Sequence, residues 1–199
     1  MLHDWSDVFL KYILPTGIIT AVFTQSLIWW REAWLSGKKK KSNAGYLAIR
    51  AAVSLEAFVE SCADVVSEID EYESSGGFAG KAIQELPDAP VYPDDDECWK
   101  AIDSKLLEKI LSFPNSLRAS QKHIHNEFYH GGDPVDLARV CLEQACATGI
   151  EAWELAVDLR KKYRFPEHSP AYDYVAFLRK RADEEMEVRK KERERDGNL

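Results

Sequence analysis

Histidine, glutamate and arginine side chains are concentrated in one short segment, RASQKHIHNEFYH, which covers Arg118–His130. If the segment is helical, residues at i, i+4 and i+7 share one flank of the helix. His123, Glu127 and His130 have this spacing. Imidazole and carboxylate groups placed this way can ligate one metal ion, so His123, Glu127 and His130 form a candidate metal site.

The last four residues of that candidate have the E-x-x-H spacing of carboxylate-bridged di-iron bundles. Those bundles need a second E-x-x-H motif and two further glutamates. No second motif occurs in the sequence, although Glu56 and Glu60 could supply carboxylates from another helix. We therefore predict that no cofactor is bound.

Arg118 and His123 form a second candidate, within RASQKH. This R-x4-H spacing resembles the motif of HEPN-type ribonucleases, which are small all-helical domains. The resemblance covers six residues, and it implies that Arg118, His123 and the neighbouring His125 act on the scissile phosphate of RNA, usually across a dimer. Ala119 stands where that family often has a polar residue, and a chain of this composition is expected to contain roughly one such match by chance.

A third interpretation is that these residues have no chemical role. Arg118, His123, His125, Glu127 and His130 would then be boundary residues of a helical core, hydrogen-bonded within the bundle. No nucleophile elbow, glycine-rich phosphate loop or pair of catalytic carboxylates occurs in the sequence. We prefer this interpretation, which leaves open whether the protein is an enzyme.

Several long helices must position these residues. Apolar residues that recur every three or four positions predict helices at about 42–72, 99–113, 115–130, 134–163 and 172–195, with a break at Pro114. The charged second half of the last helix is expected to project into water or onto a partner. The segment 74–93, which contains prolines and no sustained period, is expected to be a functional or mobile loop.

An apolar run precedes these helices. Tyr12–Trp30 has no charged residue and would extend about 28 Å as a helix, close to the ~30 Å hydrocarbon thickness of a bilayer. Tryptophans flank the run and lysines follow it at 38–41, which predicts a single-pass membrane protein with its N-terminus outside, its C-terminal domain cytoplasmic and lipid contact through residues 8–34. A buried core helix and a cleaved signal peptide are the alternatives. Small residues that would favour self-association of the span share one face: Thr16, Gly17, Thr20, Ala21 and Thr24.

Together these patterns predict an all-α protein, with an N-terminal single transmembrane helix followed by an antiparallel bundle of three to four long helices. The predicted parts are 1–41 (short N-terminal segment, span and basic linker), 42–182 (cytoplasmic bundle) and 183–199 (charged tail). The net charge of -8 argues against a nucleic-acid partner. The four cysteines form no C-x-x-C pair and should be reduced thiols.

The predicted function follows from a strong architecture and the lack of a specific site. We predict a membrane-anchored interaction or scaffold module, which acts through a protein partner or self-association. The alternative is a membrane-tethered enzyme, either an HEPN-like ribonuclease or a metal-dependent protein, with its site around Arg118–His130.

Overall fold

The computed structural model describes residues 14–81, 85–94, 96–130 and 133–196. These residues contain helices and no strand, which confirms the all-α prediction. The helices are α2 (Leu14–Ser74), α3 (Asp96–Trp99), α4 (Ser104–Tyr129), α5 (Pro134–Tyr163) and α6 (Tyr174–Asp196). The chain divides into two compact units, Met1–Asn43 and Ala44–Leu199, and α2 contributes residues to both.

The prediction of a single-pass membrane protein is contradicted. Across the described part of the chain, no helix combines the length and the apolar character needed to cross a bilayer. Tyr12, where the predicted span begins, lies outside the described residues, and α2 begins at Leu14. The hydroxyl and amide side chains in the run reduce its hydropathy, and Arg31 follows directly. The predicted localisation, with the N-terminus outside and a cytoplasmic C-terminal domain, depended on that span and is therefore not supported.

Two predicted interruptions of helices are absent. α2 continues through the basic segment 38–41, because lysine is a good helix former and no proline occurs between Pro15 and Pro87. α4 likewise continues through Pro114, where the proline removes one N–H donor from the helix without ending it. The broken helix expected there is a single helix of 26 residues.

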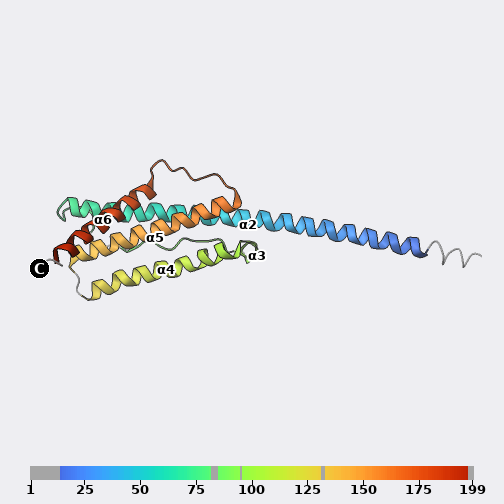
Figure 1. The fold of residues 1–199 in the computed structure, drawn as a ribbon, viewed down its shortest axis with the longest axis horizontal. Coiled ribbons are helices and arrows are strands. Elements are labelled where there is room, and N and C mark those ends of the chain that lie inside the picture. Colours follow the sequence, from blue (N-terminus) through green and yellow to red (C-terminus); the bar gives the residue numbers. More distant parts are fainter. Residues whose placement is uncertain (1–13, 82–84, 95, 131–132, 197–199) are drawn as a thin grey trace, which may run out of the picture. The chain divides into compact units, whose positions relative to one another are not determined.

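The segment between α2 and α4 returns along α2. Lys81 N–H donates to the Glu68 carbonyl, and the Ser54 hydroxyl donates to the Val91 carbonyl at 3.0 Å, so the segment runs from the end of α2 back toward its middle. α4 therefore begins beside the earlier part of α2 and runs parallel to it. Figure 1 shows α2, α4 and α6 running in one sense and α5 in the opposite sense. The predicted antiparallel packing applies to α4 with α5 and to α5 with α6, but not to α2 with α4.

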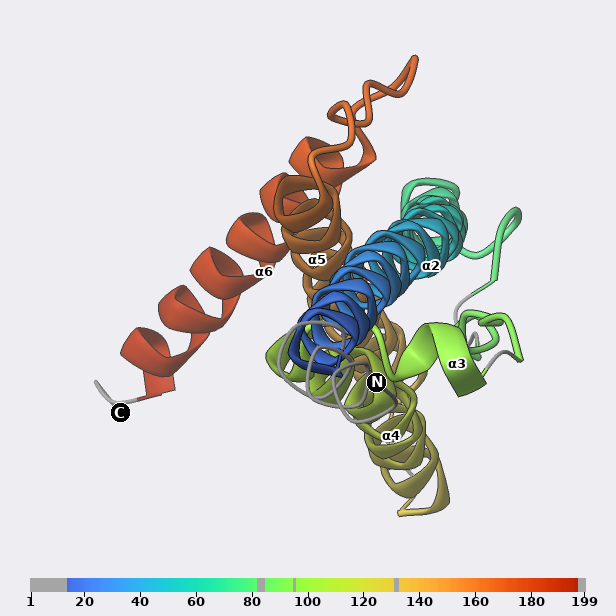
Figure 2. The ribbon, with the colours of Figure 1, turned by 90° about the vertical axis from the view of Figure 1, so that its right-hand side faces the viewer.

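The core of the unit 44–199 lies between α2, α4, α5 and the start of α6. Phe58 of α2 and Phe113 of α4 pack edge to face, with ring centroids 5.4 Å apart. Gly149 permits close contact at the centre of α5, because a Cβ atom there would lie 2.7 Å from Leu178 Cδ1 and 3.1 Å from Cys62 Cβ. The end-on view in Figure 2 places α3 and α6 on opposite sides of the bundle.

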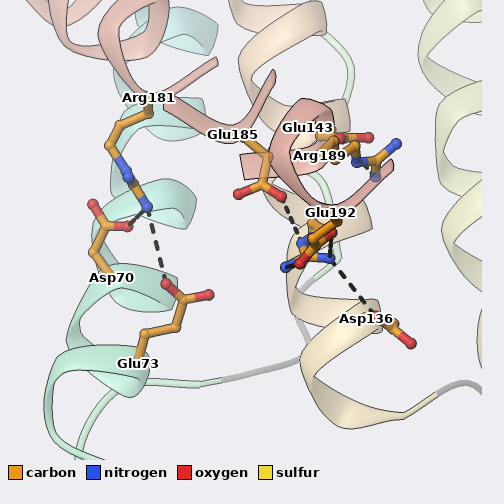
Figure 3. A network of polar contacts seen from close by, with 9 residues as sticks. Asp70, Glu73, Asp136, Glu143, Arg181, Glu185, Arg189 and Glu192 are labelled. Atoms are coloured by element: carbon orange, nitrogen blue, oxygen red, sulfur yellow. Dashed lines mark hydrogen bonds and ion pairs between the residues drawn. The ribbon is translucent and has the colours of Figure 1, made fainter. Parts of the chain in front are cut away.

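Ion pairs hold α6 against α5 and α2 beyond its apolar first turns (Figure 3). We expected the second half of α6 to project, but contacts continue to Glu192. The pairs between helices, with their N–O distances, are Arg181–Asp70 (2.5 Å), Arg181–Glu73 (4.0 Å), Arg139–Glu185 (2.6 Å), Arg139–Glu192 (3.2 Å) and Arg189–Glu143 (2.6 Å). Charge complementarity therefore replaces apolar burial along this part of α6.

All four cysteines are buried, and none of these four described residues forms a disulfide. Burial raises the pKa of Cys62 and of Cys146 to about 12. We expect iodoacetamide at pH 8 to leave both unmodified in the folded protein and to modify both in denaturant, because the thiolate is the reactive form.

An unfolded thiol ionises near pH 9, so the folded state retains protons that the unfolded state loses between about pH 9 and 12. The free energy of unfolding should therefore fall as pH rises through that window, as urea titrations would show.

Candidate functional site

The residues proposed from sequence lie on the outer surface of α4. His123, His125, Glu127 and His130 are all exposed, as is Arg118. Of their neighbours, Leu117 and Ile124 are buried, whereas Phe128 is 51% exposed. The candidate residues therefore lie on an exposed surface of the helix.

Side-chain contacts of Arg118 and His125 stay within α4. Arg118 Nη1 donates to Asn115 Oδ1 at 3.3 Å, and the His125 ring packs edge-on against Tyr129 with centroids 4.6 Å apart. In the part of the chain that the structure describes, no group of three or more His, Cys, Asp or Glu residues is arranged to hold a metal ion. The catalytic roles proposed for Arg118, His123 and His125 and the metal site proposed at His123, Glu127 and His130 therefore stay predictions.

The structure instead brings together a buried ion pair that sequence reasoning did not identify. Glu56 of α2 is 8% exposed and receives two hydrogen bonds from Arg160 of α5, at 2.5 Å to Oε1 and 2.8 Å to Oε2. This bidentate pairing raises the pKa of Arg160. The two residues are 104 positions apart, so the pair fixes α5 against α2 at this level.

The segment 164–173, which joins α5 to α6, folds over this ion pair; we call it the linker. Arg160 Nη1 donates to the Pro166 carbonyl at 2.9 Å, and His168 Nδ1 lies 3.7 Å from Glu56 Oε2. The His168 ring also faces Trp153, with centroids 6.1 Å apart. Arg160 and Glu56 thus bind the linker as well as each other.

Two adjoining clefts open beside the linker, and they share Glu56, Trp153 and His168. The first, which we call the acidic cleft, has a volume of about 350 Å³ and is also lined by Glu60, Asp173 and Tyr174. The second, the basic cleft, has a volume of about 580 Å³ and is also lined by Arg160, Lys161 and Arg164. Glu56 and Glu167 also line the basic cleft, so it combines three basic side chains with two carboxylates, whereas the described lining of the acidic cleft has carboxylates and neither lysine nor arginine.

The polar groups of the acidic cleft have defined partners. The Tyr174 hydroxyl donates to Glu60 Oε1 at 2.9 Å, and this bond raises the pKa of Tyr174. Asp173 caps α6 by accepting a hydrogen bond from Ala176 N–H at 2.9 Å. Within the described ranges, neither Glu60 nor Asp173 forms an ion pair, so no cationic side chain neutralises these two carboxylates in the cleft.

One backbone feature marks the basic cleft. Arg164 ends α5 in the left-handed conformation, at φ 58° and ψ 40°, and it is the one non-glycine residue with positive φ among those described. Glycine is the usual residue at this position, because a Cβ atom is disfavoured there. The cleft therefore has an arginine where helix termination alone would favour glycine.

A weak sequence signal for this site exists. Glu56 lies between Ala52 and Val59 at helical spacing, so a carboxylate occupies the apolar stripe of α2. Arg160 likewise lies within the apolar stripe of α5, next to Leu159. A charged residue inside each of two stripes suggests a buried ion pair. His168 carries no such signal, because its position depends on the path of the linker.

Known proteins do not identify these clefts. The chain was compared with protein-family models, with curated proteins and with solved structures, and none of the three comparisons found a match.

Proposed function

We propose that residues 44–199 act as a non-catalytic interaction module, which receives a partner at the two clefts around Glu56, Trp153 and His168. The observation that carries this proposal is the bidentate Glu56–Arg160 pair beneath the linker. A concave surface with an aromatic side chain and a few fixed polar groups is the usual form of a binding site.

The Glu56–Arg160 pair supports the proposal because it positions the walls of the clefts, and not because it stabilises the fold. Burying two charges costs desolvation energy, so such a pair is weak evidence of a stability role. Its guanidinium contacts α2 and the linker together, since Arg160 bonds both Glu56 and the Pro166 carbonyl. This arrangement holds the walls of both clefts in place before a partner arrives, which lowers the entropic cost of binding.

The side chains around the pair are suited to contact with another protein. Trp153 is half-buried, and Val53 and Val157 beside it are 52% and 40% exposed. Tryptophan and arginine are enriched among the residues that dominate binding energy at interfaces. A partner could therefore bury an apolar surface here while its polar groups contact the charged rim of the clefts.

Catalysis at Arg118–His130 is the alternative, and it has less support. Catalytic groups usually converge in a concave site from which water is excluded. His123, Glu127 and His130 are instead exposed on the surface. The interaction proposal therefore predicts that alanine at these three positions leaves partner binding unchanged.

A cross-linking experiment tests the proposal. The full-length chain would carry a photoreactive amino acid at Ala171, which lines the acidic cleft, or at Ser116, which is exposed on α4. In the native cell we expect a discrete adduct from position 171 and not from position 116. Trp153→Ala should reduce that adduct by at least about tenfold. Circular dichroism would verify that each variant is folded.

Two results would contradict the proposal. One is an equal adduct yield at positions 171 and 116. The other is an adduct that survives Trp153→Ala but is lost in the His123→Ala/His130→Ala double variant, because the functional surface would then be on α4.

A further inference from the structure

The charge of the acidic cleft restricts what can bind there. Glu56 is neutralised by Arg160, but Glu60 and Asp173 line the same cleft without an ion-pair partner among the described residues. Many other carboxylates of this unit are compensated, for example Asp158 by Lys109 at 2.9 Å and Glu143 by Arg189 at 2.6 Å. A cationic ligand group would compensate Glu60 and Asp173 in the same way.

The apolar wall of the cleft also suits a cation on an aliphatic stem. The indole of Trp153 attracts ammonium and guanidinium groups through its ring face. Val53 and Ala57 line the cleft near it and offer contact to methylene groups. Lysine and arginine side chains combine a methylene stem with a cationic head.

The neighbouring basic cleft indicates a longer ligand than a single amine. Lys161 and Arg164 line it together with Glu167, and neither of the two cations forms an ion pair in the described part of the chain. The two clefts share Trp153 and His168, so one extended ligand can reach both. A ligand with a cation at one position and an anion a short distance along the chain matches both clefts, and a peptide provides that arrangement.

We infer that the two clefts bind a peptide segment of the partner, with a lysine or arginine in the acidic cleft and an aspartate or glutamate facing Lys161 and Arg164. This inference rests on the proposed function and specifies the chemistry of the partner. Glu60 and Asp173 select the cation, Trp153 contacts its stem, and Arg164 contacts the anion.

Peptide titration of the full-length chain tests the inference. The probes are capped peptides with arginine and glutamate separated by one, two or three alanines. The control peptide has norleucine and glutamine in place of the charged residues. The shift of the Trp153 indole N–H resonance is measured by NMR. We expect a saturable shift with at least one arginine–glutamate peptide, and affinity at least about tenfold weaker for the control peptide.

Matched variants identify the residues responsible. The double variant Glu60→Gln/Asp173→Asn should weaken binding at least about tenfold, and asparagine at 173 keeps the helix cap of α6. Glu71→Gln removes one carboxylate from α2 at an exposed position outside the clefts, so binding should change by less than about twofold. Equal weakening by both variants would overturn the inference, because a general effect of net charge would explain it.

Other outcomes separate this inference from the proposed function. No shift with any charged peptide, together with a cross-link at position 171, would overturn the peptide chemistry and leave the interaction module standing. Binding of methylguanidinium as tight as that of the best peptide would also overturn the inference, because the ligand would then be a small cation. Loss of both the cross-link and the peptide shift would refute both proposals.

Discussion

Replacing Arg160 by methionine is expected to lower the free energy of unfolding by about 3 to 5 kcal/mol, because Glu56 is then buried without its cation. The side chains of Glu56 and Arg160 are 6% and 12% exposed, so the carboxylate left behind is largely desolvated. Urea titration followed by circular dichroism measures the change. The double variant Glu56→Leu/Arg160→Met should recover most of the loss, because it removes both charges together.

An exposed ion pair provides the control. Lys109 of α4 pairs with Asp158 of α5 at 2.9 Å, but these side chains are 61% and 47% exposed. Lys109→Met should therefore lower the free energy of unfolding far less than Arg160→Met does, because solvent screens an exposed ion pair. If Arg160→Met costs no more than Lys109→Met, the Glu56–Arg160 pair is not buried as described.

Replacing Gly149 by valine is expected to lower the free energy of unfolding by about 3 kcal/mol, since overpacking a core contact typically costs 1 to 3 kcal/mol. The first added atom would lie 2.7 Å from Leu178 Cδ1 and 3.1 Å from Cys62 Cβ, and valine adds two further methyl groups. The Leu178 side chain can move, but Cys62 is on the facing helix and requires a backbone shift. Thermal and urea unfolding of the variant provide the measurement.

A glycine elsewhere in the same unit provides the opposite expectation. A Cβ atom at Gly45 would lie 3.7 Å from Phe165 Cζ, which is an ordinary van der Waals distance. Gly45→Ala should therefore stabilise the protein by about 0.5 to 1 kcal/mol, through the higher helix propensity of alanine. A Gly149→Val variant as stable as Gly45→Ala would mean that α5 does not pack against α2 and α6 as the structure shows.

Local chemistry made some helices predictable from sequence. The apolar spacing predicted a helix at 134–163, and α5 runs from Pro134 to Tyr163, with the Asp133 side chain accepting a hydrogen bond from Val135 N–H at its start. Apolar spacing also predicted the helical character of α2 and α6. The continuity of α2 and α4 was missed, because breaks were assigned at lysine and proline residues that a packed helix tolerates.

The path of the chain and the site depend on contacts that no local pattern encodes. α4 runs parallel to α2 because the segment before it returns along α2, a path fixed by bonds such as Ser54 to Val91. Helical spacing placed His123 and Glu127 on one flank of α4 but could not show whether another element covers that flank. The Glu56–Arg160 pair joins residues 104 positions apart, so its existence follows from the tertiary fold.

The ratio of cross-linked adduct at position 171 to that at position 116 tests the central claim most directly, because it compares the cleft with the surface of α4 in one chain. The account predicts a ratio of at least about ten, and a fall toward one in Trp153→Ala. A ratio near one in the unsubstituted chain would contradict the claim that the clefts around Glu56, Trp153 and His168 are the partner-binding surface.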